Sequence, residues 1–167
     1  MTPDTSSTSA PISLDKGEGE ALWFFGGLTT IKASGEQTGG RLAMTENLAP
    51  RGSGSPLHVH NREDEWFYVI DGELTLWVGG DTIVAPAGSF VYGPQGIPHT
   101  FVVSSETARF LLGVNPAGFE GFTRAVAEPA LRLEIPPPPT EAPDLELVAA
   151  AAASFGIDII GPPGIPE

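Results

Sequence analysis

The chain has 167 residues, and its 21 acidic and 8 basic side chains give a formal net charge of −13 at pH 7. This length predicts one domain. The charge excludes a basic surface for nucleic acid and attraction to an anionic membrane, and no apolar run is long enough to span a bilayer. With no cysteine, disulfides and thiolate metal ligands are excluded, which is consistent with a cytoplasmic protein.

The first two thirds of the chain have the pattern of an all-β domain. Residues 1–20 are rich in Ser, Thr, Pro, Gly and acidic side chains, which predicts a flexible N-terminal segment. Between residues 21 and 118, short apolar segments alternate with Gly, Pro, Asn and Asp clusters, as is typical of a barrel or sandwich. Asp71-Gly72 predicts a hairpin turn. The expected strands are 22–25, 28–33, 40–48, 56–60, 65–70, 73–78, 82–84, 89–92, 98–103 and 108–114.

Residues 119–167 are expected to form a helical and irregular C-terminal extension that packs on the barrel. The spacing of apolar residues in 117–128 predicts a short helix. The proline run within 131–143 predicts an extended linker. Alanine-rich residues 144–155 predict a second helix, and the tail, residues 157–167, is expected to be irregular.

All three histidines lie in two motifs that are bounded by turn residues. The motifs are Gly52-x5-His58-x-His60-x4-Glu65-x6-Gly72 and Gly88-x5-Pro94-x-Gly96-x2-His99. Imidazole and carboxylate together suit a first-row divalent metal. The glycines and the proline have a simpler reading as turn residues that the fold needs.

Strand geometry predicts how the motif side chains meet. Successive side chains of a strand alternate between faces, so His58 and His60 project from the same face. Glu65 opens the next expected strand, and we expect this strand to pair with its predecessor and bring the carboxylate beside the imidazoles. Glu65 is in register with the inward-facing side chains, and Glu63 and Asp64 are interpreted as solvated turn residues.

The two motifs resemble the signature motifs of the cupin superfamily, and the resemblance covers about residues 22–118. The first motif matches at every fixed position, whereas Val103 stands where the second family motif carries Asn. Residues 24–40 and 115–121 are similar to the quercetinase-like subgroup of small bacterial single-domain cupins. This resemblance implies an all-β fold, a double-stranded β-helix (jelly-roll) barrel with a few short C-terminal helices.

The resemblance also implies a metal site and a reaction. The implied ligands of one divalent transition metal are His58, His60, Glu65 and His99, and Fe, Mn, Ni, Co and Zn all suit them. The implied function is a dioxygenase for a small enolisable or aromatic substrate, with Glu65 as both ligand and catalytic base. Two alternatives stay open: a non-redox isomerase, cyclase or lyase, and a cupin that binds a small molecule without turnover.

Apolar side chains beside the expected ligands predict a substrate pocket. Phe67 shares the face of Glu65, while Phe101 and Val103 share the face of His99. These three side chains would supply the apolar wall that an aromatic substrate needs.

Large apolar side chains on the opposite face predict self-association. Trp66 and Tyr68 alternate with the inward-facing residues and therefore face outward. Together with Trp23, Phe24 and Phe25, they form a larger set of apolar side chains than the surface of one small barrel usually exposes. We expect a homodimer, the commonest closed assembly.

Overall fold

Strands dominate the protein, whose computed structural model describes residues 10–167. The strands are β1 (Glu20–Phe24), β2 (Gly27–Ala33), β3 (Ala43–Pro50), β4 (Pro56–His60), β5 (Asp64–Asp71), β6 (Glu73–Val78), β7 (Asp81–Pro86), β8 (Phe90–Gly93), β9 (His99–Val103), β10 (Thr107–Asn115), β11 (Glu128–Pro129) and β12 (Ile157–Pro163). The helices are α1 (Gly35–Thr38), α2 (Phe119–Val126) and α3 (Leu145–Ser154).

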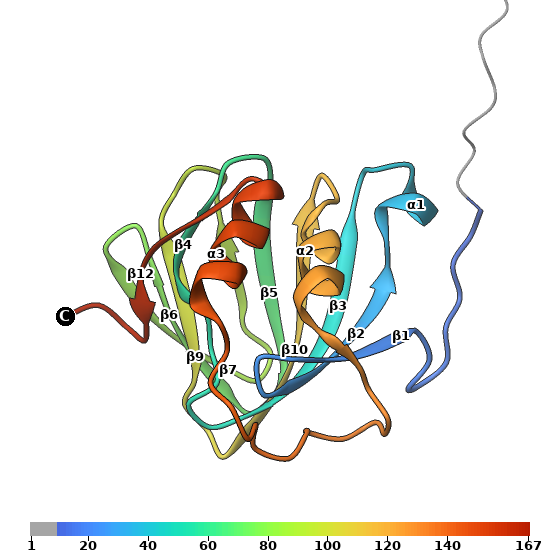
Figure 1. The fold of residues 1–167 in the computed structure, drawn as a ribbon, viewed down its shortest axis with the longest axis horizontal. Helices are drawn as coiled ribbons and strands as arrows, with labels where there is room; N and C mark the ends of the chain where they lie inside the picture. Colours follow the sequence, from blue (N-terminus) through green and yellow to red (C-terminus); the bar gives the residue numbers. More distant parts are fainter. Residues whose placement is uncertain (1–9) are drawn as a thin grey trace, which may run out of the picture.

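The strands form two antiparallel sheets that enclose the core (Figure 1). One sheet has the order β11-β1-β2-β3-β10-β5-β8, and the other has the order β12-β4-β9-β6-β7. The largest buried cluster contains residues of both sheets, among them Phe67 and Phe110 from the first and Leu74, Leu76 and Val103 from the second. The expected all-β jelly-roll architecture is confirmed, and each of the ten expected strands is present.

The turn at Asp71-Gly72 is not a hairpin, contrary to the sequence-based expectation. β5 pairs with β8 and β10, whereas β6 pairs with β7 and β9, so the chain crosses between the sheets at Gly72. The glycine is required there for two reasons: its φ is 78°, and an added Cβ would lie 2.2 Å from the carbonyl oxygen of Thr107. A turn dipeptide indicates a reversal of the chain but not which strands will pair.

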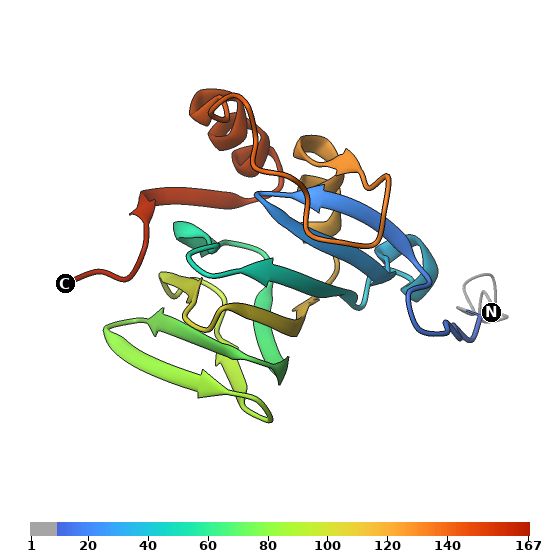
Figure 2. The ribbon, with the colours of Figure 1, turned by 90° about the horizontal axis from the view of Figure 1, so that it is seen from below.

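The C-terminal tail contains a strand, which the sequence analysis did not predict. β12, the red strand in Figure 2, pairs antiparallel with β4. Ile157 lies opposite His60, and Ile159 lies opposite His58. Ile157 is buried, and its apolar side chain alternates with exposed Asp158 as in other half-buried strands. Prolines in this strand are tolerated because β12 lies at the edge of its sheet.

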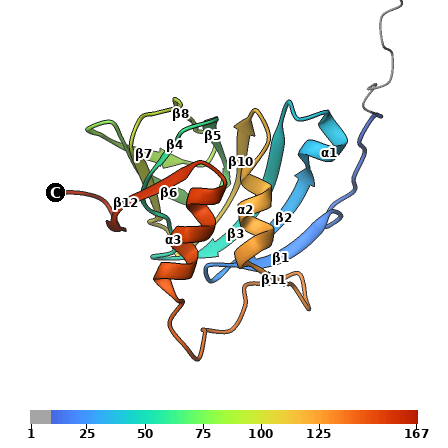
Figure 3. The same cartoon turned by 45° about the horizontal axis from the view of Figure 1, so that its top comes forward.

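Helices α2 and α3 lie side by side outside the strands (Figures 1 and 3). They share a second apolar cluster, centred on Phe122, Ala152 and Ile157. Asp144 begins α3 by accepting hydrogen bonds from the backbone amides of Glu146 and Leu147. Within residues 10–167, no helix has the length and apolar character needed to cross a membrane.

Candidate metal centre

Three imidazoles come from neighbouring strands of the five-stranded sheet. His58 and His60 occupy alternate positions of β4, and His99 is the first residue of β9, directly opposite His58. All three side chains are buried. The Nε2 atoms of His58 and His60 are 3.2 Å apart, so the rings direct the same nitrogen to one point.

The carboxylate reaches this point from the opposite sheet. Glu65 lies on β5, and its Oε2 is 2.7 Å from Nε2 of His99 and 3.5 Å from Nε2 of His60. The expected pairing of the Glu65 strand with β4 is therefore wrong, because the two strands belong to different sheets. The site is assembled across the interior, where β4 and β9 face β5.

These residues meet the basic requirement of a metal site. Each offers one ligand atom, and the four atoms lie within 4.8 Å of one another in a buried group: His58, His60, Glu65 and His99. The four side chains that the resemblance implied as ligands are thus brought together, and the group can bind a metal.

Each histidine ring makes a hydrogen bond through Nδ1, on the side away from the centre, and these bonds show that the three imidazoles can bind a cation through Nε2. Nδ1 of His58 donates to the carbonyl oxygen of Pro56 at 2.8 Å, and Nδ1 of His99 donates to that of Ile97 at 2.9 Å. Nδ1 of His60 donates to a carboxylate oxygen of Glu63 at 2.9 Å. With the proton on Nδ1, the Nε2 lone pair is left to face the centre, as a metal ligand requires.

The pKa shifts of the histidines and of Glu65 indicate that this group attracts a positive charge. Burial alone would lower the pKa of His60, but the charges and hydrogen bonds of Glu65 and Glu63 outweigh it and raise the pKa to about 10. Burial lowers the pKa of His58, against the influence of Glu65. Burial would raise the pKa of Glu65, but the three histidines hold it well below 4.5. The group therefore favours one positive charge at its centre.

Glu63 is not a solvated turn residue, and that interpretation is wrong. Its side chain is 2% exposed, and its carboxylate is the acceptor for His60 Nδ1. Asp64 is only partly buried and accepts a hydrogen bond from the backbone amide of Gln95. A buried metal-binding histidine needs an acceptor behind it, so the acid three residues after His60 was the signal available in the sequence.

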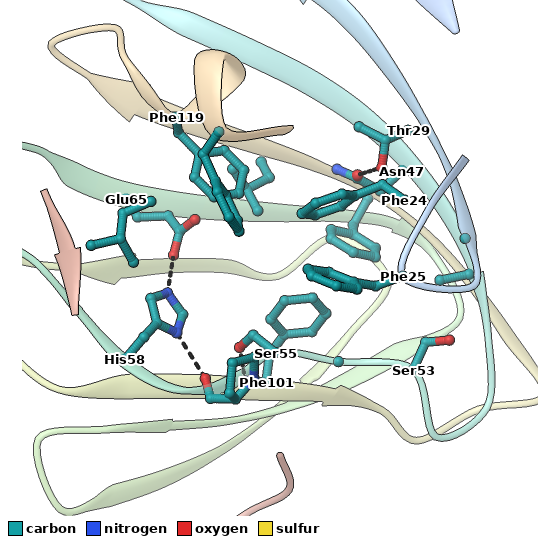
Figure 4. A pocket seen from close by; sticks show the side chains of 18 of the residues that line it. Phe24, Phe25, Thr29, Asn47, Ser53, Ser55, His58, Glu65, Phe101 and Phe119 are labelled. Carbon is teal, nitrogen blue, oxygen red and sulfur yellow. Dashed lines mark hydrogen bonds and ion pairs between the residues drawn. The ribbon is translucent and has the colours of Figure 1, made fainter. Parts of the chain in front are cut away.

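An apolar pocket leads to the candidate metal site. It reaches His58 and Glu65 and is partly open to solvent. Figure 4 shows His58 and Glu65 on one side of the pocket and Thr29 and Asn47 on the other, with phenylalanine rings between them. Six phenylalanines line it: Phe24, Phe25, Phe101, Phe110, Phe119 and Phe122.

Of the three side chains expected in a substrate pocket, Phe101 alone is among the lining residues. Phe67 and Val103 are 2% and 1% exposed in the core, and the Phe67 ring packs against Phe101 at 5.4 Å between centroids. They support the pocket wall from behind. Much of the remaining wall comes from β1, β2, β3, β10, α2, α3 and β12, segments that the two motifs do not include.

Comparison with known proteins agrees with the motifs and the fold. The family model described as "Cupin domain" matches residues 44–114, which include His58, His60, Glu65 and His99. Residues 44–114 therefore match a cupin domain. Quercetin 2,3-dioxygenase from Bacillus subtilis is 29% identical to this chain over 121 residues, which are 72% of this chain and 36% of that protein. An uncharacterized protein from Streptomyces coelicolor is 37% identical over 54 residues, 32% of this chain and 51% of that protein.

Solved structures share the fold of this chain at low sequence identity. An RmlC-like cupin from Shewanella frigidimarina matches with a TM-score of 0.55 and 20% identity, over 66% of this chain and 96% of that one. A predicted oxalate decarboxylase from Thermotoga maritima matches with a TM-score of 0.54 and 20% identity, over 64% of this chain and 99% of that one. The curated relatives are longer than the matched segment, which spans 36% and 51% of their lengths.

Proposed function

We propose that this cupin is a metal-dependent dioxygenase that acts on a small enolisable or aromatic molecule. The observation that carries the proposal is the phenylalanine-lined pocket, which reaches His58 and Glu65. Apolar walls with a few polar groups at one side are the usual design of a site that orients a planar organic ligand. The similarity to quercetin 2,3-dioxygenase supports oxygen chemistry at this site.

We propose one divalent transition metal as the cofactor, either Fe, Mn, Ni, Co or Zn. Its ligands would be His58, His60, Glu65 and His99. When bound, such an ion supplies Lewis acidity and open positions for a substrate oxygen and for O2. The hydrogen bonds behind the three rings hold the imidazoles in one orientation, so the protein need not reorganise when it binds the ion.

Glu65 is proposed to act as a general base as well as a ligand. It borders the pocket, so a substrate hydroxyl that enters from the phenylalanine side meets this carboxylate. Transfer of the hydroxyl proton to Glu65 leaves an electron-rich enolate or phenolate, which O2 can oxidise. Both atoms of O2 enter the product, so the reaction balances without an external reductant. Phe101 and Phe119 would exclude water from the reacting atoms.

A non-redox isomerase, cyclase or lyase is the second candidate. The same position of Glu65 at the pocket supports it, because a buried carboxylate can move a proton between substrate atoms without O2. The third candidate is a cupin that binds a small molecule without turnover. O2 uptake separates the first candidate from the other two, and product formation separates the second from the third.

The test begins with protein purified without a chelating tag, followed by elemental analysis. The metal-loaded cupin is then given a panel of enolisable and aromatic compounds, including quercetin, in an oxygen-electrode cell. We expect one O2 consumed per product, with both atoms of ¹⁸O2 found in the product by mass spectrometry. Product without O2 uptake would establish the non-redox candidate, and an inert metal-loaded protein would favour the binding protein.

We propose a homodimer, based on the outer face of β5 and β8. Tyr68 and Phe90 are 42% and 62% exposed, Ile70 and Tyr92 are exposed beside them, and β8 is an edge strand. Phe24 and Phe25, which the sequence argument counted toward the dimer surface, line the pocket instead. Light scattering at micromolar concentration should return twice the chain mass of 17.4 kDa, and the mass of one chain would contradict the proposal.

We also propose the expected organisation of the chain and its cellular location. The organisation is the expected flexible segment at 1–20, of which residues 1–9 lie outside the described residues, a barrel at 21–118 and a C-terminal extension at 119–167, which supplies β12 to the second sheet. Limited proteolysis should cut first before residue 21 and leave the rest intact. The protein is proposed to be cytoplasmic and to act on a small molecule rather than on nucleic acid or a membrane, which cell fractionation and binding assays test.

A further inference from the structure

The turn between β1 and β2 carries a phenylalanine where a two-residue turn rarely accepts one. Phe24 pairs with Gly27, so Phe25 and Gly26 form the whole loop. Their φ angles are 45° and 79°, and Phe25 is the one non-glycine residue with positive φ within residues 10–167. Positive φ at both positions is the type I′ pattern, which favours Asn-Gly or Gly-Gly. A bulky side chain in this region of backbone space is strained.

The Phe25 ring lies at the pocket rather than in the core. It is among the residues that line the pocket and is 40% exposed, so one part of the ring faces inward and another faces solvent (Figure 4). Its centroid is 4.4 Å from that of Phe24 and 6.5 Å from that of Phe122. These neighbours fix the ring at the outer end of the phenylalanine wall.

The lining of the pocket indicates the charge of its ligand. Among the lining residues, all of which lie in the described part of the chain, there is no Lys or Arg. Away from the metal ligands, an anionic group would therefore lose water without gaining a counter-charge. The polar pair on the far side, Thr29 and Asn47, is already joined by a 2.8 Å hydrogen bond. The lining thus suits an uncharged, largely apolar molecule.

We propose that Phe25 is a specificity-determining residue of this cupin. Its ring forms the outer wall of the pocket and contacts an uncharged aromatic ligand, and the strained turn is kept because this contact needs an aromatic side chain at that place. The inference rests on the proposed function in one respect, that this pocket is the substrate site. A strained residue retained at a ligand site costs stability and contributes to binding, so the two effects should separate on mutation.

The test uses the full-length, metal-loaded protein, three variants and a binding measurement that needs no turnover. 2-Naphthol serves as an uncharged aromatic probe and is titrated by its own fluorescence. Phe25→Asn creates the preferred Asn-Gly turn and removes the ring. Phe25→Tyr keeps a ring. Gly26→Ala is the matched control, because its φ of 79° makes any side chain strained while nothing lies within 4 Å of the added methyl group.

We expect Phe25→Asn to raise the melting temperature by a few degrees and to weaken 2-naphthol binding about tenfold. Phe25→Tyr should recover most of the affinity, and Gly26→Ala should lower the melting temperature with the affinity unchanged.

Three results would overturn the proposal: lower or unchanged stability in Phe25→Asn, unchanged 2-naphthol affinity in that variant, or no binding of 2-naphthol to the wild-type protein. Failure of the proposed dioxygenase is a distinct result, because O2 uptake can be absent while the predicted binding pattern holds.

Discussion

Replacing Glu63 with alanine should weaken metal binding although Glu63 is not itself an expected ligand. Its carboxylate accepts the Nδ1 proton of His60 at 2.9 Å, and both side chains are almost fully buried, at 2% and 1% exposure. Without this acceptor, the His60 ring can carry its proton on Nε2 instead, where it occupies the position of the metal. The ring is also free to turn away from the centre.

The size of the effect follows from the burial of this pair. Loss of a carboxylate that orients a metal-binding histidine costs about 10- to 100-fold in metal affinity. That range corresponds to about 1.4–2.7 kcal/mol. It agrees with the cost of about 1–3 kcal/mol for leaving a buried donor without a partner. Because no water replaces the carboxylate without entering the core, we expect the upper half of the range.

Competition with a coloured chelator gives the affinity for Zn²⁺, and Co²⁺ absorption reports the ligand geometry. Asp64→Asn is the matched control, since the adjacent acid accepts from the Gln95 amide and not from a histidine. Its metal affinity should equal that of the wild type, and the Co²⁺ spectrum should change in Glu63→Ala alone. Wild-type affinity in Glu63→Ala, measured on protein that folds normally, would refute the role of Glu63.

Three further predictions concern the ligands themselves. His58→Ala and His99→Ala should each lower metal occupancy in elemental analysis and abolish any turnover, and full occupancy in either variant would contradict the assigned site. Glu65→Gln should stay inactive at full metal occupancy if Glu65 is the base, whereas recovery of activity with added metal would leave it only a ligand role. Without metal, the pKa of His60 is raised to about 10 from the value of 6.5 that represents the unfolded chain. The protonated His60 therefore stabilises the fold fully below about pH 6.5. This stabilisation is lost as the pH rises through about 10, so the urea midpoint should fall across that window, and a flat profile would contradict the shift.

The candidate ligands could be predicted from the sequence because their spacing is a local property. His58 and His60 share a strand face, and the resemblance to the cupin motif implied Glu65 among three neighbouring acids. The outward orientation of Tyr68 was predicted from the same alternation, and the structure agrees. Alternation fixes which face a side chain takes, but not which strand lies opposite.

The features that the sequence did not reveal depend on long-range pairing. The sequence placed Glu65 on a strand beside β4, whereas β5 lies in the facing sheet. Phe24 and Phe25 were assigned to the surface, because nothing near them in sequence shows that α2 and β12 complete a pocket around them. Glu63 was assigned to solvent because an acid in a turn is usually exposed, and its burial follows only from the position of His60.

The pairing of β12 with β4 has a consequence for biosynthesis. A ribosome makes the strand that carries His58 and His60 long before it makes Ile157 and Ile159, which later cover the outer edge of that strand. Until then, the histidine strand presents unpaired backbone groups to other nascent chains. Translation order therefore leaves the histidine edge of the unfinished barrel open until β12 takes its place.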